Sequence, residues 1–299
     1  MSALYTTTSP HAVARGIGRL VTLPPPSPGF IGEGHTAIHV IDAREFPAND
    51  PFILLADDRL DLPPGRRAGD PHPHAGFEIV TFVVEGELRD RDEGVLRAGD
   101  VAWMTAGSGV IHGEDIEPFG HVRILQLWIT SPSASRWTEP RLGYLAREDA
   151  PVRREPGVEA RVYSGSSGAV RAGGRTWLPL TMVDIRLAPN AIVDQLLPAS
   201  YNGFLYPLEG DVLTGGTRPQ RLTAGQIGWL EAVSPAQPTT VELAGGSDGA
   251  RVILYAGERQ DVPIVTHGPF VGETHADLVR VSQDYVRGRM PKVSDLRRR

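Results

Sequence analysis

Short apolar runs, broken by turn residues, make up most of the chain. The segment AGFEIVTFVVEG over residues 75–86 is one such run, and VAWMT over 101–105 is another. Apolar runs of this length, bounded by glycine and proline, are typical of β-strands joined by turns. The 299 residues include 34 glycines and 26 prolines, which is too many for a helical protein. The pattern therefore predicts an all-β protein.

Two stretches of the chain recur at a similar spacing. VEGEL over 84–88 is echoed by LEGDV over 208–212, and AGDVAWM over 98–104 is echoed by AGQIGWL over 224–230. A repeat of this kind indicates two related units in tandem. We expect each copy to form an apolar strand, a tight Glu-Gly turn, a polar strand, an Ala-Gly turn and a further apolar strand, which is an antiparallel hairpin pattern.

The segment between the two copies is polar and carries several prolines. Residues 131–160 show little periodicity, so a domain boundary is expected there. We expect an N-terminal domain over 1–145 and a C-terminal domain over 146–299, each long enough for a core of its own. Near the end, ADLVRVSQDYVRGRM over 276–290 has apolar residues at helical intervals and predicts one packing helix.

Composition argues against several kinds of protein. The chain has no cysteine, so it can form no disulfide, thiolate metal site or cysteine nucleophile. The formal charge of −6 argues against a large basic face, and direct nucleic-acid binding is not expected. The N-terminus lacks a charged leader followed by an apolar stretch, and no later segment approaches the roughly 20 apolar residues that span a bilayer. We therefore expect a cytoplasmic protein without membrane association.

Four ligand-type side chains form two pairs with the same internal spacing. His72 and His74 precede the run at 75–86, and His112 and Glu114 begin about 38 residues after His74. Residues two apart on a strand point to the same face, so the two pairs can converge from neighbouring strands. Three imidazoles and a carboxylate suit a divalent first-row metal and leave about two octahedral positions open. The sequence predicts a mononuclear metal site at these four residues.

The spacing leaves the metal and one ligand open. Fe(II) is the leading candidate, while Mn, Ni, Co, Cu and Zn also suit these ligands, because affinity order alone does not choose the metal in a cell. Glu78 is an alternative to Glu114 as the carboxylate ligand. It lies an even number of residues from His72 and His74, so on one continuous strand it would point to the same face. The alternative for Glu78 is a strand-end carboxylate that accepts backbone or arginine hydrogen bonds.

The other histidines have no partner at ligand spacing. His35 and His39 are four apart, and on a strand this interval is too long for both to bind one ion. Six residues are therefore expected to be non-ligands: His11, His35, His39, His121, His267 and His275.

At this point the chain resembles the pirin family of two-cupin proteins. The resemblance is carried by DPFILLADD over 50–58, DPHPHAGFEIVTFVVEGEL over 70–88, DVAWMTAGSGVIHGE over 100–114 and HGPFV over 267–271. It implies an all-β fold of two tandem cupin barrels, each a double-stranded β-helix or jelly roll, with a short C-terminal helix. It also implies that a metal, usually iron, is held in the N-terminal barrel by the residues matching His72, His74, His112 and Glu114.

The second copy of the repeat lacks side chains of this kind. In the second copy, the positions that correspond to the four ligands are occupied by Leu196, Pro198, Pro238 and Thr240. None of them offers an imidazole or a carboxylate, so the C-terminal barrel is expected to be metal-free. Stability, a cover over the first site, or partner binding are the roles left for it.

The resemblance implies two main functions. Some pirins show quercetin 2,3-dioxygenase activity, in which an open metal site binds a flavonol-like substrate and dioxygen. Glu114 would then be the catalytic base for the substrate hydroxyl if it can leave the metal. Other pirins are described as non-catalytic, iron-dependent regulators that bind a transcription or metabolic protein. A metal that only fastens strands is a third alternative, and the oxidoreductase is preferred.

Overall fold

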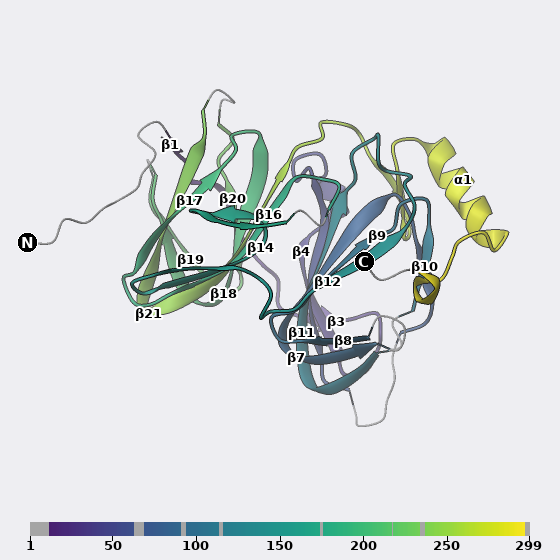
Figure 1. Ribbon diagram of the computed structural model, residues 1–299, viewed down its shortest axis with the longest axis horizontal. Coiled ribbons are helices and arrows are strands. Elements are labelled where there is room, and N and C mark those ends of the chain that lie inside the picture. The colour runs from purple at the N-terminus through teal and green to yellow at the C-terminus, as the bar shows by residue number, and fades with distance from the viewer. Residues whose placement is uncertain are drawn as a thin grey trace, which may run out of the picture. The chain divides into compact units, whose positions relative to one another are not determined.

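The computed structural model describes residues 12–62, 69–90, 94–113, 116–173, 176–216, 218–233 and 237–296. Strands dominate these residues, as predicted, and they form two cupin barrels (Figure 1). We call them the N-terminal barrel (Leu23–Ala150, Gly174–Pro179 and Gln260–Arg299) and the C-terminal barrel (Met1–Thr22, Pro151–Gly173 and Leu180–Arg259). Relative to the expected halves 1–145 and 146–299, the two units exchange their end segments.

The N-terminal barrel is built on an eight-stranded sheet and a two-stranded sheet of β10 and β6. Its elements are β3 (Ser27–Pro28), β4 (His35–Ile41), η1 (Ala43–Glu45), β5 (Phe52–Leu60), β6 (His72–His74), β7 (Phe77–Asp90), β8 (Gly94–Arg97), β9 (Val101–Thr105), β10 (Val110–His112), β11 (Ile116–Thr130), β12 (Arg141–Leu145), β22 (Val265–His267), β23 (Phe270–Gly272), α1 (His275–Val286) and η2 (Val293–Asp295).

The C-terminal barrel is built on one eleven-stranded sheet. Its elements are β1 (Val13–Ala14), β2 (Ile17–Thr22), β13 (Val152–Glu155), β14 (Val158–Ser167), β15 (Val170–Ala172), β16 (Leu180–Leu187), β17 (Ile192–Leu197), β18 (Tyr201–Thr214), β19 (Gln220–Thr223), β20 (Gln226–Leu230) and β21 (Thr239–Glu258).

Strand pairing explains why the end segments are exchanged. β1 pairs with β21 and β2 pairs with β20, so the first described strands complete the C-terminal barrel. At the other end, α1 packs on β23 within the N-terminal barrel. This helix is the one expected over 276–290, and a capping box between Thr274 and Asp277 fixes its start.

The expected Glu-Gly turns are wrong, whereas the Ala-Gly turns are confirmed. Gly86 and Gly210 lie inside the long strands β7 and β18, where the register with the partner strand shifts. Both have positive φ, +80° and +63°, and a Cβ would lie 2.3 Å and 2.2 Å from a carbonyl oxygen of the facing strand. A bulge that needs glycine bends each strand without reversing it. Ala98-Gly99 and Ala224-Gly225 do link consecutive strands.

The two barrels fill their interiors differently. The C-terminal barrel has one continuous apolar cluster that includes Val183, Leu205 and Leu254. In the N-terminal barrel, Ile79 and Val83 on β7 belong to two separate clusters. The inward residue between them is Thr81, whose hydroxyl donates to the Gln126 side chain at 3.5 Å. A polar layer therefore interrupts this interior.

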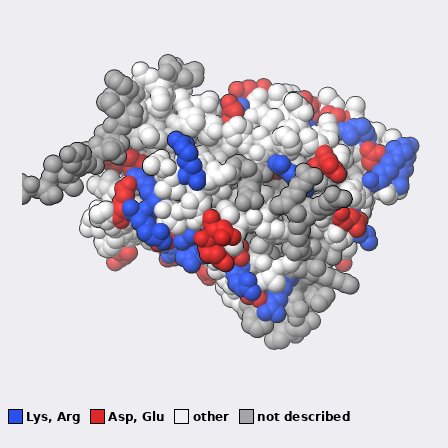
Figure 2. All heavy atoms as spheres, viewed as in Figure 1, with Lys and Arg blue, Asp and Glu red and all other residues white. Residues whose placement is uncertain are grey.

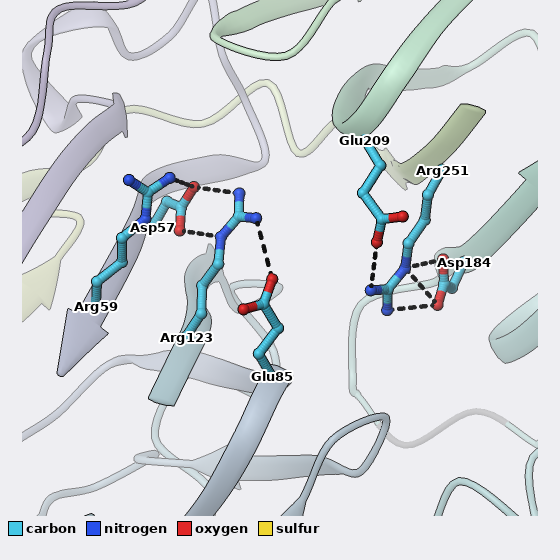
Figure 3. Close-up of polar contacts among 7 residues, drawn as sticks. All are labelled: Asp57, Arg59, Glu85, Arg123, Asp184, Glu209 and Arg251. Atoms are coloured by element: carbon cyan, nitrogen blue, oxygen red, sulfur yellow. Dashed lines mark hydrogen bonds and ion pairs between the residues drawn. The ribbon is translucent and has the colours of Figure 1, made fainter. Parts of the chain in front are cut away.

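A buried arginine ties three strands of the N-terminal barrel together (Figure 3). Arg123 on β11 donates two hydrogen bonds of 2.8 Å to Asp57 on β5. Its third nitrogen lies 3.8 Å from Glu85 on β7, and Arg59 on β5 faces it in the register. Bidentate pairing of this kind is the strongest form of an arginine–carboxylate contact.

The C-terminal barrel repeats this cluster at matching register positions. Arg251 on β21 binds Asp184 on β16, with Nη2–Oδ2 at 2.9 Å and Nε–Oδ1 at 3.1 Å. Its Nη1 lies 3.4 Å from Glu209 on β18, and Arg186 faces it on β16. The internal repeat thus extends to the buried Asp–Arg pairs, which lie outside the two repeated sequence segments.

Charges of both signs are mixed on the surface. On the face drawn in Figure 2, Lys and Arg atoms are interspersed with Asp and Glu atoms. Within the described residues, no helix has the length and apolar character needed to cross a membrane.

The buried arginines allow a test of the scaffold. We expect Arg251→Met to destabilise the protein by about 3–5 kcal/mol, because removing one partner leaves a buried carboxylate unpaired. Glu209→Gln is the matched control, since its side chain is 57% exposed and the change should cost less than about 1 kcal/mol. Urea unfolding followed by circular dichroism measures both, and equal losses would contradict the assignment.

Candidate metal centre

Three of the four expected ligand residues lie together at one end of the N-terminal barrel. β6 and β10 pair antiparallel, with His72 opposite His112 and His74 opposite Val110. One ring nitrogen from each histidine lies within 4.8 Å of the other two. The two-residue spacing thus places three imidazoles on one face, as the sequence indicated. We call these residues the His triad.

Glu114 lies outside the described residues. Its roles as fourth ligand and as catalytic base therefore stay predictions.

The electrostatics of the His triad suit a cation. Burial, and then the neighbouring His112 and His72, hold the pKa of His74 well below its ordinary value. The Pro269 carbonyl opposes this slightly, yet neither ring nitrogen of His74 makes a well-formed hydrogen bond to a described residue. A neutral imidazole with an available nitrogen is the form that binds metal, and leaving it buried without a partner is unfavourable. The donor set therefore fits a divalent metal.

The strands that carry the triad are held from outside by the end of the chain. We call residues 265–296 the C-terminal strap. Beside β6, Val271 donates a backbone hydrogen bond to Ala75 at 3.0 Å, and beside β10, Ile111 donates to Pro291 at 2.8 Å. A two-stranded sheet is marginal alone, and the strap adds hydrogen bonds at Ile111 of β10 and at Ala75, directly after β6.

Apolar packing reinforces the strap. Leu278 and Val281 of α1 form a buried cluster with Ala75, Phe270 and Met290, with Ile111 of β10 packed against it. In Figure 1 the strap, drawn in yellow, runs along the outside of the N-terminal barrel beside β10. The helix expected from the sequence thus packs behind the strands of the triad.

A buried arginine fixes the junction between β6 and β7. Arg136 is fully buried and donates to the Gly76 carbonyl at 2.8 Å, to the Thr130 hydroxyl at 3.0 Å and to Glu273 at 3.1 Å. Burial lowers the pKa of its guanidinium, and Glu273 opposes this. Because Glu273 lies in the strap, Arg136 links the turn after His74 to the strap.

Glu78 is not part of the triad, and the parity argument that favoured it is wrong. The chain turns at Ala75 and Gly76, so β6 and β7 are separate strands. The Glu78 carboxylate instead accepts hydrogen bonds from the Thr105 hydroxyl at 2.7 Å and the Trp177 backbone N–H at 2.9 Å. Burial raises its pKa, against these hydrogen bonds. The alternative expected for it, a strand-end carboxylate with backbone partners, is correct.

A cavity of about 430 Å³ opens inside the same barrel. Its walls come from β4, β5 and β11 and include Leu54, Ala56, Ile124, Gln126 and Trp128. The Trp128 ring also packs on His74, with the ring centroids 5.3 Å apart. The Trp128 side chain therefore lines the cavity and also contacts the His triad.

Sequence reasoning missed the polar residues of this cavity. His35, His39, Asp58 and Gln126 line it together with apolar neighbours. The missed signal is the position of Asp58 and Gln126, because the other residues that line the cavity from β5 and β11 are apolar. Polar side chains at such places are unusual unless they are paired or bind something.

Comparison with known proteins agrees with this architecture. The family model described as Pirin matches residues 37–129, and the Pirin C-terminal cupin domain matches residues 182–291. Pirin-1 of Arabidopsis thaliana is 35% identical over 260 residues, covering 85% of this chain and 88% of its own. The chain belongs to the pirin family.

Solved structures place this pirin among bicupins. The GK1651 protein of Geobacillus kaustophilus superposes with a TM-score of 0.76 at 37% identity, covering 84% of this pirin and 99% of its own chain. A structure named quercetin 2,3-dioxygenase from Acinetobacter baumannii superposes with a TM-score of 0.81 at 25% identity, over 93% of this pirin and 98% of its own chain. The expected fold of two cupin barrels is confirmed.

Removing a triad histidine should abolish metal binding. We expect His74→Ala to lose the divalent ion, because two imidazoles remain where three converge. His121→Ala is the matched control, since this histidine is exposed and is not part of the triad. Metal analysis after reconstitution with Fe(II) measures both variants, and full metal content in His74→Ala would contradict the assignment.

Glu78 should make stability depend on pH. Its pKa in the folded protein is raised above the ordinary value of 4.5, so its contribution to stability is complete below that value and is lost as the pH rises through the raised pKa. Glu78→Gln stays neutral, and it can keep both contacts if its Oε1 accepts from the Trp177 N–H while its Nε2 donates to the Thr105 hydroxyl oxygen. We expect urea unfolding to show the wild type losing stability relative to Glu78→Gln as the pH rises from 4.5. A difference in the free energy of unfolding that does not change with pH would contradict the raised pKa of Glu78.

Proposed function

We propose that this pirin is an oxidoreductase of the quercetin 2,3-dioxygenase type that acts on a flavonol-like substrate at a mononuclear iron site. His72, His74, His112 and Glu114 are the proposed ligands. The observation that carries the proposal is the contact between Trp128 and His74, because it connects the wall of the cavity to the triad. The proposed compartment is the cytoplasm.

The cavity suits a flat aromatic molecule. Its volume of about 430 Å³ lies within the roughly 300–1,000 Å³ of small-molecule sites. Its walls are mostly apolar, and the buried Trp128 Nε1 has no hydrogen-bond partner among the described residues. Phe77 packs against the Trp128 ring, with the ring centroids 4.4 Å apart and the planes tilted by 35°.

The His triad limits which metals can bind, but it does not identify one of them. Imidazole ligands accept iron, and also Mn, Ni, Co, Cu and Zn, so Fe(II) is proposed on the family resemblance. Bound there, the ion would supply open positions for a substrate oxygen and for dioxygen. The low pKa of His74 keeps that ring neutral and available for coordination.

Glu114 is the proposed base for the substrate hydroxyl. A carboxylate beside the ion can accept this proton if it is not held permanently as a ligand. The structural similarity to the quercetin 2,3-dioxygenase from Acinetobacter baumannii supports the reaction class.

A second candidate is a non-catalytic, iron-dependent regulator that binds a protein partner. The C-terminal strap favours it, since Ile111 of β10 and Ala75 directly after β6 are hydrogen-bonded to residues on either side of α1. Val279 and Val286 of α1 are exposed, and a partner could bind this face. The regulator would require that different states of the ion favour different positions of the strap.

Dioxygen uptake distinguishes the two candidates. We expect protein loaded with Fe(II) without air to consume dioxygen in proportion to product when a flavonol is added. His112→Ala should lose all turnover above background, because the ion is no longer held, while His121→Ala should keep it. An oxygen electrode with metal-quantified samples makes the measurement. No uptake by fully loaded protein would count against the dioxygenase.

A further inference from the structure

Arg136 is a buried cation beside the turn that follows His74. Its side chain is fully buried, and arginine is almost never buried to this extent without partners. Its three nitrogens donate to three separate segments: Nη1 to the Gly76 carbonyl, Nη2 to the Thr130 hydroxyl and Nε to the Glu273 carboxylate. None of these residues belongs to the His triad, and the proposed function gives Arg136 no role.

The first residue of this turn is held by the C-terminal strap. The Ala75 N–H donates to the Pro269 carbonyl at 3.3 Å, and the Ala75 carbonyl accepts from the Val271 N–H at 3.0 Å. Ala75 directly follows His74 in the chain. The strap therefore fixes the backbone next to this ligand.

The second residue of the turn, Gly76, is held by Arg136 and by the segment before β10. Its carbonyl accepts from Arg136 at 2.8 Å, and its N–H donates to the Gly107 carbonyl at 2.9 Å. The φ of Gly76 is +88°, and a Cβ there would clash with the Val271 carbonyl oxygen, so only glycine fits. Both backbone polar groups of Gly76 are thus paired in a closely packed turn.

The contacts of Arg136 connect the strap to both strands of the triad. Glu273 lies in the strap between β23 and α1, Gly76 follows β6, and Gly107, which Gly76 binds, precedes β10. A binding site tolerates displacements of its groups of only about 0.5 Å. Residues that support metal ligands from outside typically change metal affinity by about 10- to 100-fold when they are altered.

We infer that Arg136 is a positioning residue of the metal site. It holds the turn after His74 between the strap and the segment before β10, and it thereby raises the affinity of the His triad for a divalent ion. This inference rests on the metal site of the proposed function, and it adds a residue that acts through the backbone without touching the ion. Because coupling between two sites is reciprocal, the bound ion stabilises the strap in return.

Cobalt binding tests the effect on affinity. Arg136→Lys keeps the positive charge, but a single ammonium cannot serve three acceptors that face three guanidinium nitrogens. We expect the Kd for Co(II), measured by competition with a chelator, to rise about tenfold. The visible spectrum of the Co(II)-saturated variant should also shift, because displaced imidazoles change the ligand field. A merely structural role would lower stability without moving that spectrum.

Arg251→Lys is the matched control. Arg251 is also buried and pairs with carboxylates, but it belongs to the C-terminal barrel, which contains no residue of the triad. We expect this variant to lose stability while it keeps the wild-type Kd and the wild-type Co(II) spectrum.

Glu273→Ala tests the same link from the side of the strap, and it decides the question if Arg136→Lys does not fold. Glu273 is 31% exposed, so its truncation leaves the core intact. Arg136 keeps its bonds to Gly76 and Thr130 in this variant. The Kd for Co(II) should therefore rise, but by less than in Arg136→Lys.

Hydrogen exchange measures the reciprocal effect on the strap. Saturating Co(II) should slow the exchange of the Val271 N–H, which donates to Ala75, and of the Ile111 N–H, which donates to Pro291. This protection should be smaller in Arg136→Lys, because the link between the strap and the turn is weakened.

Three outcomes would overturn the role of Arg136: an unchanged Kd and spectrum in both Arg136→Lys and Glu273→Ala, an equal loss of affinity in Arg251→Lys, or exchange that Co(II) does not slow. No binding of Co(II) by the wild type would overturn the metal site together with this role. Co(II) binding that depends on Arg136, without dioxygen uptake by the iron-loaded protein, would keep Arg136 and reject the dioxygenase.

Discussion

The geometry of the His triad depends on backbone hydrogen bonds supplied by a distant part of the chain. β6 and β10 are three residues long each, and together they make too few contacts to persist alone. The strap adds hydrogen bonds outside both strands, and Arg136 ties the turn after His74 to it. Precise ligand geometry needs such support, because imidazoles on a loose hairpin would not converge.

The same scaffold supports a filled interior in one barrel and a hollow interior in the other. In the C-terminal barrel, apolar side chains pack continuously, so the barrel contributes stability. In the N-terminal barrel, Thr81, Gln126 and Asp58 occupy inward positions where apolar residues would close the space. The interior of the N-terminal barrel therefore combines a cavity with polar side chains at a few inward positions.

Local patterns in the sequence were sufficient to predict the strands, the Ala-Gly turns and the convergence of the three histidines. The Glu-Gly expectation failed because a bulge and a turn differ in what lies opposite, here a carbonyl on a facing strand next to Gly86. The expectation that Glu78 points to the same face as His72 and His74 failed because the chain turns between His74 and Phe77. The strap and the hydrogen bond between His35 and Asp58 join segments far apart in sequence, which single-chain periodicity does not register.

The two matching arginine clusters limit which single substitutions each barrel tolerates. Losing Arg251 alone leaves Asp184 buried with an unbalanced charge, so single changes at these positions pass through a poorly folded intermediate. A metal-ligand position faces no such barrier, and residues such as Leu196 and Thr240 now pair across β17 and β21. Single substitutions at the positions that match the ligands, such as Leu196 and Thr240, therefore cost the fold less than single substitutions within the buried ion pairs.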